Sequence, residues 1–166
     1  SRDNSVKIVR ELLENQNIDP NILDNNGRSP FHLAVLSYNP LEIIRELLKN
    51  QNVNVNILDN DGKTPLHLAV SSYNPLEIVR ELLENQNIDP NILDNDGKTP
   101  LHLAVSSYNP LEIVRELLEN QNIDPNILDN DGKTPLDLAV LKNNLELAHM
   151  LLSDSRMLVG KIWYCI

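Results

Sequence analysis

Apolar positions in residues 65–83 follow two helical patterns separated by a polar turn. In the first pattern, residues 66–70 are apolar almost all round, which is typical of a helix buried between neighbours. In the second, residues 76–83, apolar side chains recur at helical spacing, and the glutamates and arginine between them form a polar face. The pattern predicts a pair of short helices joined at residues 71–73.

Residues that favour helix starts precede both segments. Thr64 and Asn74 are favoured caps, and each stands before a proline, which suits the first helical position because its missing N–H has no partner there in any case. Glu77 stands where an acid reaches back in a capping box. After the second helix, residues 89–94 should be extended, and residues 95–98 (Asn-Asp-Gly-Lys) should form a tight turn.

The same pattern recurs every 35 residues. The string Pro-Leu-His-Leu-Ala-Val and its close variants begin at Pro30, Pro65, Pro100 and Pro135. Residues 65–99 and 100–134 are identical at all 35 positions. Periods of this length indicate a stacked solenoid rather than one closed core.

Residues 59–69 read Asp-x-x-Gly-x-Thr-Pro-Leu-His-Leu-Ala, and Leu-Glu-Ile-Val at 76–79 and Leu-Leu at 82–83 follow. This combination resembles the ankyrin repeat, and the match recurs at least four times over about residues 5–153. The resemblance implies an all-α fold, an ankyrin-like solenoid of helix-turn-helix units. Antiparallel helix pairs would stack, and β-hairpin-like finger loops would project from them.

Two features depart from the family pattern, whose repeat is commonly about 33 residues long. Each unit has one extra residue between its helices and another after the second helix, where residues 86–89 (Gln-Asn-Ile-Asp) replace the usual Gly-Ala-Asp. The glycine that usually ends this helix in the left-handed conformation is missing. We therefore expect Asn85 or Asn87 to adopt that conformation instead.

We interpret residues 1–166 as a single solenoid with unequal ends. Its parts are a partial repeat at 1–29, full repeats at 30–64, 65–99 and 100–134, an atypical repeat at 135–155 and an apolar tail at 156–166. The last repeat has Asp137 in place of histidine and Met150 where the middle repeats carry glutamate. We expect the tail to fold back over the end of the stack near Met150 and Leu141, with disorder and an oligomer contact as the alternatives.

Composition narrows the function classes. The chain has 14 Lys and Arg against 24 Asp and Glu, a net charge of −10. Proteins that bind nucleic acid usually carry a basic patch, so this balance argues against nucleic acid as a partner. There is no apolar run of about 18 residues, so no membrane span is expected. The single cysteine, Cys165, can form neither an internal disulfide nor a cysteine-based zinc site, which favours a reducing, cytoplasmic location.

Two polar residue types recur once per repeat, namely His32, His67 and His102, and Asp24, Asp59, Asp94 and Asp129. Helices in contact lie about 8–10 Å apart, whereas zinc ligands lie about 2 Å from the ion, so the histidines cannot share a metal. The resemblance implies instead that each imidazole bonds the backbone and the Thr hydroxyl beside the finger. The aspartates should bond their own backbone at the start of each turn.

No sequence signal of catalysis stands apart from the repeats. The aspartates form a row without a nucleophile, and the glycines are isolated, one per turn, rather than gathered in a phosphate-binding loop. An enzyme would also need a pocket, whereas a repeat stack offers a groove. We expect no enzyme, no cofactor and no metal.

Tyr38, Tyr73 and Tyr108 form a further row at the turns between the helices. We expect each ring to pack on the next repeat with its hydroxyl in water. The alternative is a row of binding hot spots, in which aromatic residues are enriched.

The favoured function is a non-catalytic protein–protein interaction module whose finger loops and first helices form a concave face. By residue-to-residue resemblance, the partner-binding positions are Asn25, Asn26, Arg28, Leu36, Ser37, Asn60, Asp61, Lys63, Ser71, Ser72, Asn95, Asp96, Lys98, Ser106, Ser107, Asn130, Asp131, Lys133, Leu141 and Lys142. We expect a protein partner, basic or extended, and a monomeric chain, with an oligomer through the tail as the alternative. Identical repeats also fit an idealised, engineered or recently duplicated scaffold with no specific natural ligand.

Overall fold

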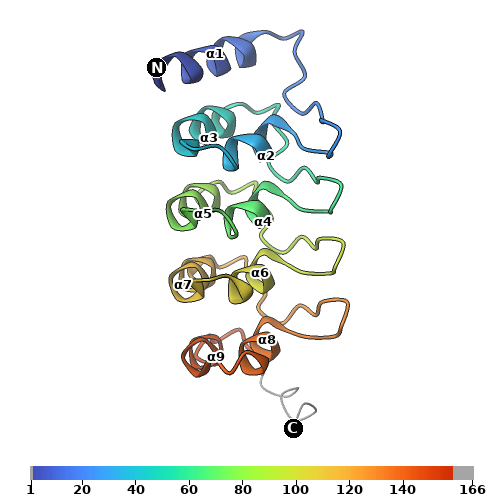
Figure 1. Cartoon of the computed structure of the whole chain (residues 1–166), viewed down its shortest axis with the longest axis vertical. Coiled ribbons are helices and arrows are strands. Elements are labelled where there is room, and N and C mark those ends of the chain that lie inside the picture. The colour runs from blue at the N-terminus through green and yellow to red at the C-terminus, as the bar shows by residue number, and fades with distance from the viewer. Residues whose placement is uncertain (1, 159–166) are drawn as a thin grey trace.

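A computed structural model of the chain describes residues 2–158, and side chains from Ser5 onward. These residues form helices that stack in one column, with loops projecting along one side (Figure 1). The helices are α1 (Arg2–Glu14), α2 (Pro30–Val35), α3 (Pro40–Lys49), α4 (Pro65–Ala69), α5 (Pro75–Leu83), α6 (Pro100–Ser106), α7 (Pro110–Glu119), α8 (Pro135–Leu141) and α9 (Leu145–Leu152). No strand occurs within the described residues, so the all-α prediction is confirmed. None of the described helices is long and apolar enough to cross a membrane.

Each first helix of a pair starts from a capping box. At α4, Thr64 Oγ1 accepts a hydrogen bond from the backbone N–H of His67 (3.3 Å), and the His67 ring accepts one from the Thr64 N–H (3.1 Å). The second helices α3, α5 and α7 start differently, because the asparagine before each makes no side-chain cap bond. The expectation of an Asn cap with Glu77 as its capping-box partner is therefore wrong. Before α9, by contrast, Asn144 Oδ1 accepts a hydrogen bond from the Leu147 N–H (3.1 Å).

The core lies between stacked repeats and follows the predicted apolar stripe. Leu66, Val79 and Leu82 are at most 1% exposed, and their counterparts in the other full repeats are equally buried. Leu83, also assigned to the stripe, is only half-buried at the edge of this core. Full burial of one leucine contributes about 1.5–3 kcal/mol, so the row of buried leucines holds consecutive repeats together.

The second helices end without a residue in the left-handed conformation. Among the described residues, Asn143 (φ 54°) is the only non-glycine with positive φ, so the expectation for Asn85 and Asn87 is wrong. Instead, the Asn85 N–H donates to the Leu82 carbonyl (3.0 Å), and Asn85 Oδ1 accepts from the Asn87 N–H (2.9 Å). This side-chain turn replaces the missing glycine because asparagine bonds its own backbone readily.

Residues 153–158 continue the register of the earlier repeats. Met157 is buried, and the Arg156 guanidinium donates to three backbone carbonyls in and after the last turn of α7, those of Leu118 (2.6 Å), Asn120 (2.8 Å) and Ile123 (3.0 Å). This start of the tail therefore runs beside the preceding repeat rather than back over Leu141, which is 67% exposed. The rest of the tail expectation falls on residues 159–166, outside the described residues.

Candidate partner-binding surface

Each finger is a turn that its own aspartate closes. In the second finger, Asp59 Oδ1 accepts from the N–H groups of Asp61 and Lys63, both at 2.9 Å. The Asp59 N–H donates to the Lys63 carbonyl (2.9 Å), and Gly62 turns the chain with φ of 74°. The same bonds recur at Asp24, Asp94 and Asp129, so the predicted structural role of these aspartates is confirmed.

Neighbouring fingers are hydrogen-bonded to one another. The Asn95 N–H donates to the Asp61 carbonyl (3.0 Å), and its side-chain Nδ2 donates to the Asn60 carbonyl (3.0 Å). Asn60 and Asn130 make the same pair of bonds to their preceding fingers. These three asparagines, predicted to bind a partner, thus hold the row of fingers together. The sequence does place an asparagine at the same position in successive turns. That recurrence fits hydrogen bonding between fingers, but it fits an exposed polar loop equally well.

The histidines join each first helix to the next finger. The His67 ring lies with Nδ1 2.8 Å from Thr64 Oγ1 and Nε2 3.0 Å from the Lys98 carbonyl. A carbonyl only accepts, so Nε2 carries the hydrogen, and Nδ1 accepts from the Thr64 N–H. The predicted bonds of the imidazole to backbone and hydroxyl are confirmed. Burial lowers the pKa of His67, and likewise those of His32 and His102.

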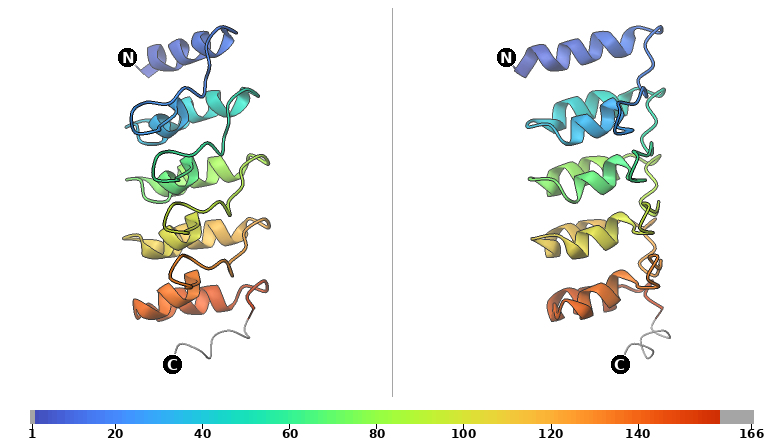
Figure 2. Two further views of the ribbon diagram at one scale, coloured as in Figure 1. Left: turned by 90° about the vertical axis from the view of Figure 1, so that its right-hand side faces the viewer. Right: turned by 45° about the vertical axis from the view of Figure 1, so that its right-hand side comes forward.

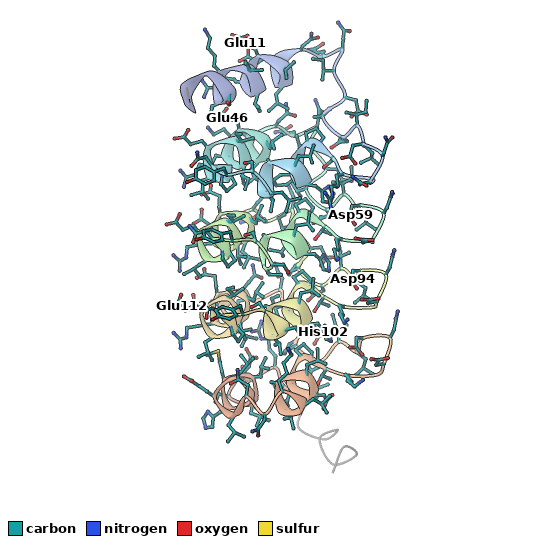
Figure 3. The ribbon with its side chains drawn as sticks, viewed as in Figure 1. Glu11, Glu46, Asp59, Asp94, His102 and Glu112 are labelled. Atoms are coloured by element: carbon teal, nitrogen blue, oxygen red, sulfur yellow. The ribbon has the colours of Figure 1, made fainter. Side chains whose placement is uncertain are left out.

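Charge at the finger tips is largely paired within each finger. Lys63 Nζ lies 3.7 Å from Asp61 Oδ2, and the corresponding distances in the next two fingers are 3.3 Å and 3.1 Å. The aspartates remain 70–75% exposed, whereas the lysines are about one-third exposed. The tips therefore offer exposed carboxylates whose charge a neighbouring lysine reduces, and Figure 3 places Asp59 and Asp94 on this side of the molecule.

The remaining predicted positions continue this surface along the first helices. Leu36, Ser71, Ser106, Leu141 and Lys142 are exposed where these helices end. Ser37, Ser72 and Ser107 are half-buried, and each hydroxyl donates to a helix carbonyl at 2.8 Å. Asn25 and Asn26 are exposed at the first tip, and Arg28 beside them is half-buried. The structure thus places the predicted set on the finger side and at the ends of the first helices.

The polar face of the second helices is tied by ion pairs that cross between repeats. Arg10, Arg45 and Arg80 reach Glu46, Glu81 and Glu116 of the following repeat at 2.9, 2.7 and 2.6 Å. Hydrogen bonds from Arg10 and Lys49 lower the pKa of Glu46 to about 2. Much of the acidic charge on this face is therefore paired with arginine rather than free to attract a partner.

The tyrosine row departs from its expected packing. Tyr38, Tyr73 and Tyr108 are 96%, 106% and 97% exposed, so the expectation that each ring packs on the next repeat is wrong. The turn carries each ring beyond the last buried residue at the end of the first helix, such as Val70 directly after α4, and no neighbour covers the ring. No group of three or more His, Cys, Asp or Glu in the described part of the chain is placed to hold a metal ion.

The stacked helix pairs, the bonded fingers and the capping histidines define a helical repeat solenoid. A family model described as ankyrin repeats (3 copies) matches residues 1–94 and 76–159, and the chain belongs to the ankyrin repeat family. No curated protein matches the chain. Repeats of this family are generally protein–protein interaction modules and are typically non-enzymatic.

Proposed function

We propose that the chain holds a protein partner on the face formed by its finger tips and the exposed ends of its first helices. The observation that carries this proposal is the row of bonded fingers, which presents the same exposed carboxylate at Asp61, Asp96 and Asp131. Hydrogen bonds between fingers fix the finger backbones that carry these side chains relative to one another. A preorganised surface loses little conformational entropy when it binds, which favours affinity.

A capture experiment tests the assignment of this face. The full chain is immobilised and exposed to lysate of its source cell at low and high salt, beside a variant with Asp61, Asp96 and Asp131 changed to Lys. The matched control changes Glu14, Glu84 and Glu119 to Lys, which alters the net charge equally at the exposed ends of the second helices. The partner should be lost at high salt and with the finger variant, and kept by the control. Hydrogen exchange of the captured complex should show protected finger amides.

The scaffold alternative has its own support. Residues 65–99 and 100–134 are identical, so they present the same tips twice, whereas most partner surfaces are not periodic. A well-folded chain that captures nothing would favour this alternative. Capture that survives the finger substitutions would place the partner on another surface.

A further inference from the structure

A second surface lies at the opposite end of the helices from the fingers. The turns that join the paired helices point away from the finger side (Figure 2), and each of three turns carries one tyrosine. We call Tyr38, Tyr73 and Tyr108, together with Glu42, Glu77 and Glu112, the tyrosine edge. Figure 3 shows Glu112 on the side away from Asp94. Rings that are 96–106% exposed contribute almost no burial to the fold, so packing gives no account of them.

Two hollows border the tyrosines of this edge. Tyr73 and Tyr108 border one hollow of about 630 Å³, whose floor includes Leu103 and Ile113. Tyr38 borders another, of about 290 Å³, with both Glu42 and Glu77 in its lining. The two hollows differ in lining, but each is bordered by at least one exposed tyrosine ring and includes apolar side chains.

The carboxylates at this edge are available to a cation. Glu42, Glu77 and Glu112 are exposed in the first turns of α3, α5 and α7. None of the three accepts a hydrogen bond or forms an ion pair within residues 5–158. The nearest basic side chain of the first hollow, Arg45, already binds Glu81 at 2.7 Å. Arg45 and Arg80 lie near enough to Glu42 and Glu77 for the opposite charges to interact, but neither arginine forms an ion pair with these glutamates. The edge therefore combines exposed aromatic rings with carboxylates that are free to form an ion pair.

The spacing of this pattern fits an extended chain. Stacked helices lie about 8–10 Å apart, so the tyrosines and glutamates recur at about that step. A polyproline II segment rises about 3.1 Å per residue, and three residues span about 9 Å. A cation at every third position would meet one ring and one carboxylate per repeat. Arginine suits both contacts, because its guanidinium stacks on aromatic faces and pairs with carboxylates.

We propose that the tyrosine edge binds an extended basic segment of a protein partner in which arginine recurs at every third residue. This surface lies away from the finger tips but adjoins the exposed ends of the first helices, because Ser71 and Ser106 also line the larger hollow. Substitutions at the finger tips therefore distinguish this proposal from the proposed function. A periodic ligand also accounts for the identical repeats 65–99 and 100–134, because each repeat would bind one copy of the same three-residue unit of the ligand.

Fluorescence anisotropy with labelled synthetic peptides tests the proposal on the full chain. The probe has four arginines, each followed by two prolines, and the control peptide has four arginines, each followed by three prolines. The probe should bind more tightly than the control, because only its period matches the repeat step. Changing Tyr38, Tyr73 and Tyr108 together to Ala should weaken binding of the probe about 10- to 100-fold, since each exposed cation–π contact contributes about a 2- to 5-fold change. The substituted side chains are exposed, so circular dichroism should show an unchanged fold.

Two further variants locate the probe. Changing Glu42, Glu77 and Glu112 to Gln should weaken binding, whereas changing Asp61, Asp96 and Asp131 to Asn, an equal change of charge at the fingers, should leave it within about twofold. The proposal is overturned if the probe does not bind, if both peptides bind equally, or if the tyrosine variant binds as the parent does. Equal weakening by the finger variant would also overturn it, because the peptide would then lie on the finger face.

Discussion

The three buried histidines should make the stability of the fold depend on pH near neutrality. In the folded chain, Nδ1 of His67 accepts the Thr64 N–H at 3.1 Å while Nε2–H donates to the Lys98 carbonyl. Protonation would place a second hydrogen on Nδ1, facing that N–H. His32 and His102 have the same surroundings, and burial is the largest cause of the lowered pKa of each ring. Protonation therefore favours the unfolded chain.

The sign and size of the effect follow from proton binding. An unfolded histidine has a pKa of about 6.5, and the folded value lies lower, so the unfolded chain binds more protons between the two. The stabilisation is complete above about pH 6.5 and is lost as the pH falls towards the folded value. Each ring changes the free energy of unfolding by at most about 1.4 kcal/mol per pH unit, and three rings change it by at most about 4 kcal/mol per pH unit. A typical domain has about 5–15 kcal/mol of stability, so this loss is easily measured.

Urea unfolding followed by circular dichroism measures this slope. We expect the free energy of unfolding to be constant from about pH 8 to pH 7 and to fall as the pH decreases below about 6.5. In His67→Gln, the slope should decrease by about one third, because one of three rings is removed. The matched control is His149→Gln, on an exposed part of α9, which should keep the full slope. A flat profile in the parent chain, or an unchanged slope in His67→Gln, would refute the assignment.

Three further predictions concern stability and are checked by the same unfolding measurement at about pH 7.5. Leu82→Ala should cost about 2–5 kcal/mol, and Leu83→Ala clearly less, because only Leu82 is fully buried; equal costs would mean that the helix face is misassigned. Arg156→Ala should cost about 2–3 kcal/mol, because its guanidinium donates to three carbonyls in and after the last turn of α7; a change below about 0.5 kcal/mol would contradict this role. Gly132→Ala should cost about 1–2 kcal/mol through its φ of 71° alone, and Gly62→Ala at least about 2 kcal/mol more, because its added Cβ would lie 2.8 Å from Asn95 N.

The helix pairs and the finger turns could be predicted because their causes are local. A Thr-Pro start, an apolar stripe and an Asp-x-x-Gly turn act over a few residues, and each recurs every 35 positions. Thr64 does cap α4, and Asp59 does close its finger. The division of the chain and the partner-binding residues stay predictions, since they concern boundaries and a partner rather than local geometry.

The failures concern features that depend on how neighbouring repeats meet. Whether Leu82 or Leu83 occupies the core depends on the rotation of α5 against α3 and α7, which a wide apolar stripe leaves undetermined. The exposure of Tyr73 depends on the path of a lengthened turn, and aromatic character alone favours burial. The bonds of Asn95 to the preceding finger likewise depend on how neighbouring fingers meet, and the sequence of one turn does not indicate them.

The last repeat shows what the histidine contributes. Asp137 takes its place there, and the carboxylate accepts from the Thr134 N–H (2.8 Å) and hydroxyl (2.7 Å), so the helix is capped as well as before. A carboxylate has no hydrogen to donate to a following finger, and no finger follows Asp137 within the described residues. Capping α8 therefore needs only an acceptor, whereas an internal repeat needs an acceptor and a donor on one rigid ring. Histidine meets both needs, so the same residue that couples each cap to the next finger also makes the stack sensitive to acid.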